Sequence, residues 1–140
     1  MSESSWVSTG KDLPTGGLEL QVEYREGSHS SKNHLPAIGS VIKRAFGCAE
    51  VFPGSLNLHA EVPVPFADPA RVICNGAEWW FVPVVIAESV VGIAARRPPP
   101  EVSEFLEVFA CAKLAPQLRI SYGDHVPVRV LPGAHLGLAA

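Results

Sequence analysis

Charged residues are scarce in this sequence, and neither sign forms a long run. Asp, Glu, Lys and Arg together make up 18% of the 140 residues, the net charge is −3, and basic residues never occur more than two in a row. Nucleic-acid surfaces depend on clustered Lys and Arg, so the composition does not indicate a nucleic-acid partner.

Long apolar runs are also lacking. No stretch approaches the roughly 18 residues that a membrane-spanning helix needs, and the first residues do not include the apolar segment of a signal peptide. We therefore expect a cytoplasmic protein that has no membrane partner.

Cysteine and histidine patterns that bind metals are absent. The cysteines, Cys48, Cys74 and Cys111, include no Cys-x-x-Cys pair, and the five histidines show no spacing typical of a zinc site. An odd, scattered set of cysteines is typical of free thiols in a reducing compartment. We expect three unpaired thiols and no structural zinc.

Apolar side chains, proline and glycine are abundant. Hydrophobic residues make up 47% of the chain, enough for a well-filled core in a single domain of this length. Thirteen prolines and twelve glycines favour many short elements over long helices.

The first third of the chain predicts a tail, a strand and one helix. Residues 1–17 are rich in Ser, Gly and Thr, which is typical of a flexible N-terminal tail. Apolar and polar residues alternate from Leu18 to Tyr24, as in a half-buried strand. Apolar residues then recur with helical spacing between Pro36 and Gly47, where Pro36 fits the first turn and Gly47 ends the helix.

The remainder predicts short strands. Asn75-Gly76 supplies the two positive φ angles of a tight hairpin. Residues 104–110 fit a helix or a strand equally well, and residues 113–118 fit one helical turn. Alternation from Val126 to Val130 predicts a last strand, followed by a C-terminal tail over residues 133–140. The sum is a mostly β fold: a small six-stranded barrel over residues 18–132, with one clear helix and short helical turns.

The segment Pro53-Gly54-Ser55-Leu56-Asn57-Leu58 carries the clearest chemical signal. Pro53 and Gly54 favour a turn, and the alternation after it puts Ser55 and Asn57 on one face of a strand with both leucines on the core face. A hydroxyl and an amide oxygen side by side suit Mg²⁺, which takes the rest of its ligands from water and substrate phosphates. An ordinary turn entering an ordinary strand explains the same pattern.

A polar loop is predicted from Ser28 to His34. Its hydroxyls, the Asn33 amide and the Lys32 ammonium group can grip an anion. A solvated connector between the first strand and the helix is the alternative.

Five segments together resemble the archaeal-type CTP-dependent riboflavin kinases, which are small cradle-loop β-barrels. The likeness covers residues 22–130, most of the chain, and no one segment would suffice for it. The segments are the helix between Pro36 and Gly47, Pro53-Gly54-Ser55-Leu56-Asn57-Leu58, Asn75-Gly76 with the aromatic pair after it, residues 104–114, and Gly123-Asp124-His125-Val126.

The resemblance implies a role for each matching position. Ser55 and Asn57 fall on the family's Mg²⁺ ligands, and Glu107 falls on its flavin-contacting carboxylate, which could also accept the proton of the ribityl hydroxyl. Pro99 falls where the family has a second flavin contact. The partners implied are CTP or another nucleoside triphosphate, and riboflavin with its product FMN. The nucleotide-contacting positions implied are Gly27, Ser28, His29, Ser30, Ala112, Lys113, Leu114 and Ala115.

The sequence departs from the family where the nucleotide should bind. The family's phosphate loop is rich in glycine, whereas here Gly27 is followed by Ser28, His29 and Ser30, and Ala115 replaces an arginine. These departures leave two hypotheses open. One is phosphoryl transfer to riboflavin; the other is a non-catalytic barrel that binds a nucleotide, a flavin or a protein. The first hypothesis also predicts that Glu107 lies in the same cleft as Ser55 and Asn57.

Overall fold

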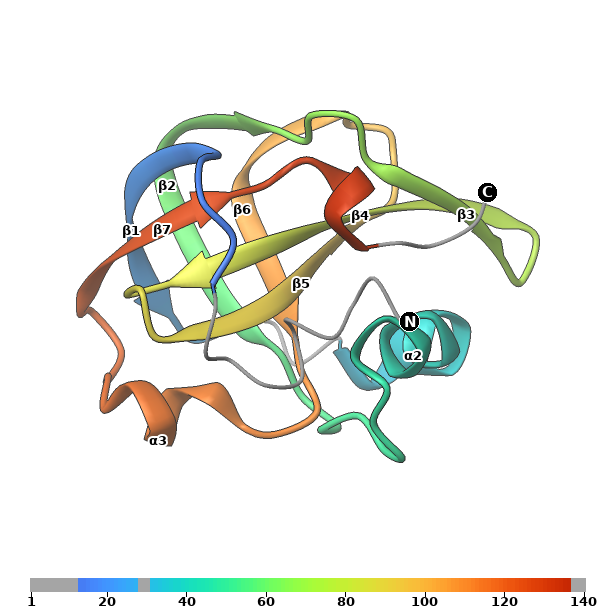
Figure 1. The fold of residues 1–140 in the computed structure, drawn as a ribbon, viewed down its shortest axis with the longest axis horizontal. Coiled ribbons are helices and arrows are strands. Elements are labelled where there is room, and N and C mark those ends of the chain that lie inside the picture. Colours follow the sequence, from blue (N-terminus) through green and yellow to red (C-terminus); the bar gives the residue numbers. More distant parts are fainter. Residues whose placement is uncertain (1–12, 28–30, 137–140) are drawn as a thin grey trace.

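The protein folds as a closed six-stranded antiparallel barrel with one long helix beside it (Figure 1). The computed structural model describes residues 13–27 and 31–136, and of residues 31 and 32 the backbone alone. The barrel strands are ordered β4-β5-β6-β2-β1-β7, and β7 closes the barrel by pairing with β4. The elements are β1 (Leu18–Arg25), α2 (Ser31–Phe46), β2 (Leu56–Pro65), β3 (Ala70–Cys74), β4 (Ala77–Ile86), β5 (Val90–Arg96), β6 (Val102–Phe109), α3 (Leu114–Leu118), β7 (His125–Val130) and the short 3-10 turn η1 (Gly133–Leu136).

Strand β3 lies outside the barrel. It pairs only with the first half of β4, and the resulting hairpin extends away from the other strands (Figure 1). Its turn has positive φ at Asn75 and Gly76, so the predicted Asn-Gly hairpin is confirmed.

The start of the helix was predicted wrongly. Helix α2 begins at Ser31, five residues before Pro36, so the part of the predicted loop from Ser31 to His34 is helical. Pro36 therefore lies in the second turn, where it lacks an N–H to donate. Tertiary contacts outweigh this cost, because Leu35 packs against the core and His34 is hydrogen-bonded to Glu107.

The apolar face of α2 was predicted correctly. Residues spaced as i, i+3, i+4, i+7 and i+8 are all buried against the barrel. Neither α2 nor α3, the α-helices of the described residues, has the length and apolar character needed to cross a membrane. The buried residues of this face are Ile38, Val41, Ile42, Ala45 and Phe46.

The ambiguous segment is a strand, β6, and a buried arginine holds its first half. Arg96 is 7% exposed, and its Nη1 donates to the carbonyls of Val64 and Glu101 at 2.8 and 3.0 Å. Its Nη2 donates to the carbonyls of Ser103 and Phe105 at 3.5 and 3.3 Å. Residues 60–63 of β2 lie opposite a single residue of β6 here, so the guanidinium replaces ladder bonds that this register shift removes.

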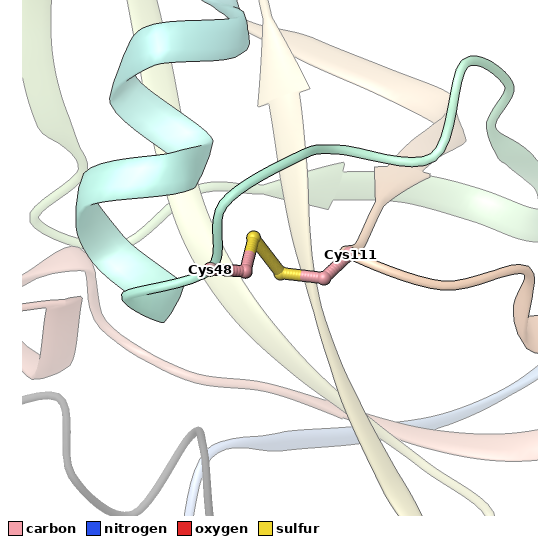
Figure 2. The surroundings of a disulfide bond; sticks show 2 residues. All are labelled: Cys48 and Cys111. Carbon is pink, nitrogen blue, oxygen red and sulfur yellow. A yellow bond between two sulfur atoms is a disulfide. The ribbon is translucent and has the colours of Figure 1, made fainter.

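Two of the three cysteines form a disulfide, so the expectation of three free thiols is wrong. Figure 2 shows Cys48, just after α2, bonded to Cys111, just after β6. The sequence could not reveal this pair, because its members are 63 residues apart and meet only through the fold. Cys74 is a buried free thiol. The cysteines therefore give no support to a reducing compartment.

Replacing Arg96 with Met should destabilise the fold by about 2–4 kcal/mol, because buried carbonyls lose a charged donor. Urea denaturation of both proteins measures the difference. Arg97→Met is the matched control, since Arg97 is exposed and should change stability by at most about 0.5 kcal/mol. Equal urea midpoints for the two variants would show that the buried guanidinium does not hold this strand.

The disulfide predicts one titratable thiol per denatured chain without reductant and three with it. Cys48→Ser/Cys111→Ser should unfold at lower urea concentration, by up to about 4 kcal/mol from the entropy of the cross-linked chain. The difference should vanish when the wild type is measured in dithiothreitol. Three reactive thiols in the unreduced protein would contradict the cross-link.

Candidate functional site

Glu107 is the centre of a polar cluster. Its Oε1 lies 3.1 Å from Nδ1 of His34, and its Oε2 accepts a 3.1 Å hydrogen bond from the Ser55 hydroxyl. Asn57 is its direct partner across the β2–β6 ladder. The structure thus places Glu107 beside Ser55 and Asn57, as the resemblance implied, although 52 residues separate Glu107 from Ser55.

Ser55 and Asn57 lie on one side of β2, as the alternation predicted. Leu56 and Leu58 are buried at 5% and 1% exposure, while the two polar residues are half-buried. The Asn57 amide nitrogen lies 3.5 Å from the Ser55 carbonyl and 3.4 Å from its hydroxyl. Together with Glu107, these side chains give a row of polar groups on the outer face of the barrel.

Gly27, which follows β1, belongs to the same cluster. A Cβ added at Gly27 would overlap the amide of Asn57, so this position accepts only glycine without a shift of its neighbours. The other predicted members of the phosphate loop, Ser28, His29 and Ser30, lie outside the described residues.

An open cleft of about 440 Å³ runs along this cluster. Its volume falls within the range of roughly 300–1,000 Å³ that is usual for small-ligand sites. It combines apolar, amide and charged groups from β1, β2 and β6. The cleft is lined by Arg25, Glu26, Gly27, Asn57, Leu58, Phe105, Leu106 and Glu107.

The predicted nucleotide-contacting segment lines a smaller, adjoining pocket of about 30 Å³. Ser55 lines this pocket but not the cleft, and its hydroxyl is hydrogen-bonded to Glu107, which lines the cleft. Ala112 and Lys113 are exposed there, whereas Leu114 and Ala115 are buried. Lys113 Nζ lies 6.0 Å from the centre of the Phe52 ring.

Tyr24 lines the same small pocket. Burial, reinforced by the neighbouring Tyr122 hydroxyl, raises the pKa of its phenol. Tyr24 therefore stays protonated at neutral pH and offers a hydroxyl, not a charge.

Pro99 does not join the cluster. It is exposed in the loop between β5 and β6, before the first residue of β6, whereas Glu107 lies near the last. It does not line the cleft. The geometry therefore gives no support to the flavin contact carried over to Pro99.

The cluster offers the types of oxygen atom that bind a hard cation, but it supplies little negative charge. Ser55, Asn57 and Glu107 offer a hydroxyl, an amide and a carboxylate, the oxygen ligands that Mg²⁺ prefers. Asn57 turns its nitrogen towards Ser55, so its amide must rotate for the oxygen to reach an ion there. Within the described residues there is no group of three or more His, Cys, Asp or Glu side chains that could hold a metal. A cation here would take the rest of its ligands from water or from the phosphate oxygens of a ligand.

Sequence reasoning missed two residues of this site. His34 was taken for a loop residue, but it lies in α2, and its ring also meets Trp79 edge-on at 5.3 Å. Phe105 was one apolar residue of an ambiguous segment, but it is 58% exposed and lines the cleft. Reading residues 104–110 as a strand would have put Phe105 and Glu107 on one face.

Gly27→Ala should destabilise the protein by about 1–2 kcal/mol, because its methyl group overlaps the Asn57 amide. Thermal unfolding measures the change, and Gly27→Ala/Asn57→Ser should recover most of it by removing the amide. Gly39→Ala is the control: a Cβ there meets no atom within 4 Å and should stabilise α2 by about 0.5–1 kcal/mol. No difference between the two alanine variants would contradict the contact between Gly27 and Asn57.

No protein-family model matches the chain, and no curated protein matches it at significant similarity. The function of the cleft must therefore be inferred from its own geometry and from the sequence resemblance.

Proposed function

We propose that the protein is a riboflavin-kinase-like phosphotransferase. It moves the γ-phosphoryl group of a nucleoside triphosphate, CTP by resemblance, to the 5′-hydroxyl of riboflavin and so makes FMN. The observation that carries this proposal is the meeting of Ser55, Asn57 and Glu107: Asn57 and Glu107 line the cleft, and Ser55 is hydrogen-bonded to Glu107. These are the residues on which the resemblance places Mg²⁺ binding and the acceptor hydroxyl.

The residues of the cluster divide the task between them. Phosphoryl transfer depends mainly on positioning and on neutralising the charge of the phosphates. Mg²⁺, held by Ser55 and Asn57 when bound, supplies that neutralisation. Lys113 is exposed beside Ser55 and adds a positive charge at the phosphate end. Glu107 is fixed by two hydrogen bonds, so its carboxylate is oriented before the acceptor arrives and can take the hydroxyl proton.

A second function is favoured by other features of the same cluster. Glu107 already has two partners, Asn57 presents its nitrogen to Ser55, and Ala115 gives no charge to a phosphate. These features suit a non-catalytic barrel that binds a nucleotide, a flavin or a protein in the cleft. The two functions differ in one measurement, the conversion of riboflavin to FMN.

Wild-type protein with Mg²⁺, riboflavin and CTP, ATP or GTP should form FMN, which chromatography with fluorescence detection measures. Glu107→Gln keeps the size of the side chain but removes the base, and should lower kcat by about 100-fold or more. Omitting Mg²⁺ should abolish turnover.

Glu101→Gln is the matched control, because that carboxylate is exposed in the loop before β6 and outside the cleft. Its kcat should equal that of the wild type. If no FMN forms with any of the three nucleotides, the kinase proposal is refuted and the non-catalytic binding barrel is the remaining function. Equal kcat values for the two glutamine variants would remove Glu107 from the reaction.

A further inference from the structure

Phe105 is an exposed aromatic side chain on a rigid stretch of backbone. Phe105 lines the cleft at a solvent-facing position, where a polar residue would be usual. The exposed fraction of this residue is nevertheless 58%. Its N–H donates to the Ser103 hydroxyl at 3.1 Å, and its carbonyl accepts from the buried Arg96 at 3.3 Å. Both backbone polar groups are thus held, so the ring projects from a fixed point.

The ring itself is supported by its neighbours. His59, the partner of Phe105 across the β2–β6 ladder, packs against it with ring centroids 4.8 Å apart. His59 is in turn held by Glu104, whose Oε1 lies 3.0 Å from its Nε2. The Phe105 ring therefore loses little freedom when a ligand covers its exposed surface.

A cross-strand aromatic pair can serve stability alone. An exposed aromatic contact also occurs elsewhere: Tyr24 of β1 and Tyr122, in the turn before β7, have ring centroids 4.9 Å apart, and Tyr122 is 60% exposed. Phe105 differs because it shares its cleft with the amide of Asn57 and the carboxylate of Glu107. An aromatic face next to an amide and a carboxylate matches a planar ring whose edge carries hydrogen-bonding groups.

We propose that Phe105 is the platform on which a planar heteroaromatic ring of the ligand stacks, with the His59–Glu104 pair supporting it. The ring's edge then faces Asn57 and Glu107. This inference deepens the proposed function, on which its choice of ligands rests. The isoalloxazine of riboflavin and the base of a nucleotide share the required chemistry, and a binding experiment separates them.

The test measures binding without transfer. Quenching of flavin fluorescence follows riboflavin and FMN, and calorimetry follows CTP, ATP and GTP. Phe105→Leu keeps apolar volume but removes the aromatic face. It should lower the affinity for the ligand that stacks on Phe105 by about 10-fold, within the range measured for bases stacked on aromatic side chains. Phe105→Trp should bind it within about threefold of the wild type, because stacking is retained.

Ile73→Ala is the control, since it removes an exposed apolar side chain of β3 from outside the cleft, and its affinity should equal that of the wild type. If the affinity for flavins depends on Phe105, the inference is supported and the stacked ring is that of the acceptor. If only the affinity for nucleotides depends on Phe105, the inference is supported and the stacked ring is the base of the nucleotide. Equal affinities of Phe105→Leu and the wild type overturn the inference, and so does a wild type that binds none of the five ligands. Binding that depends on Phe105 without FMN formation would leave the platform standing and refute only the kinase.

Discussion

The guanidinium of Arg96 holds together the part of the barrel on which the site is built. Burial lowers its pKa to about 10, so it remains charged at neutral pH while inside the protein. No carboxylate accepts its hydrogen bonds among the described residues; its donors go to four backbone carbonyls, and it lies 3.9 Å from the centre of the Phe66 ring. Five donors in a planar fork can serve carbonyls of two strands at once, which the three donors of a lysine ammonium group cannot do with the same geometry.

The hydrogen bonds of Arg96 determine where the functional side chains lie. The register of β2 against β6 shifts between His59 and Val64, and Arg96 bonds residues on both sides of that shift. Beyond it the ladder is regular, so Phe105 meets His59 and Glu107 meets Asn57. A slip of one residue would turn these side chains into the core, because successive residues of a strand face opposite sides. The polar cluster therefore depends on a buried charge that takes no part in it.

Local patterns predicted most of the fold, and contacts between distant segments account for what they missed. Alternation and the Asn75-Gly76 turn identified strands because those signals are carried by neighbouring residues. The turn at Ala87 and Glu88 had no such signal: both have positive φ without glycine or asparagine, and a bidentate ion pair between Glu88 and Arg129 of β7 supports it. At the site, Ser55 and Asn57 were predicted from their spacing. His34 was not, because its partner Glu107 is 73 residues away.

Helix α2 is fastened to the same strand at both of its ends. Near its start, His34 contacts Glu107 close to the end of β6, and just after its last residue Cys48 is bonded to Cys111 beyond that strand. Ser55, whose hydroxyl is hydrogen-bonded to Glu107, lines the small pocket together with the exposed Lys113. A helix linked to the strand at one end only could move away from it at the other end. Two links fix the distance between α2 and β6 along the site. His34 thus holds Glu107 directly, while the disulfide, formed by two of the cysteines expected to be free thiols, ties the other end of α2 to the segment that follows β6.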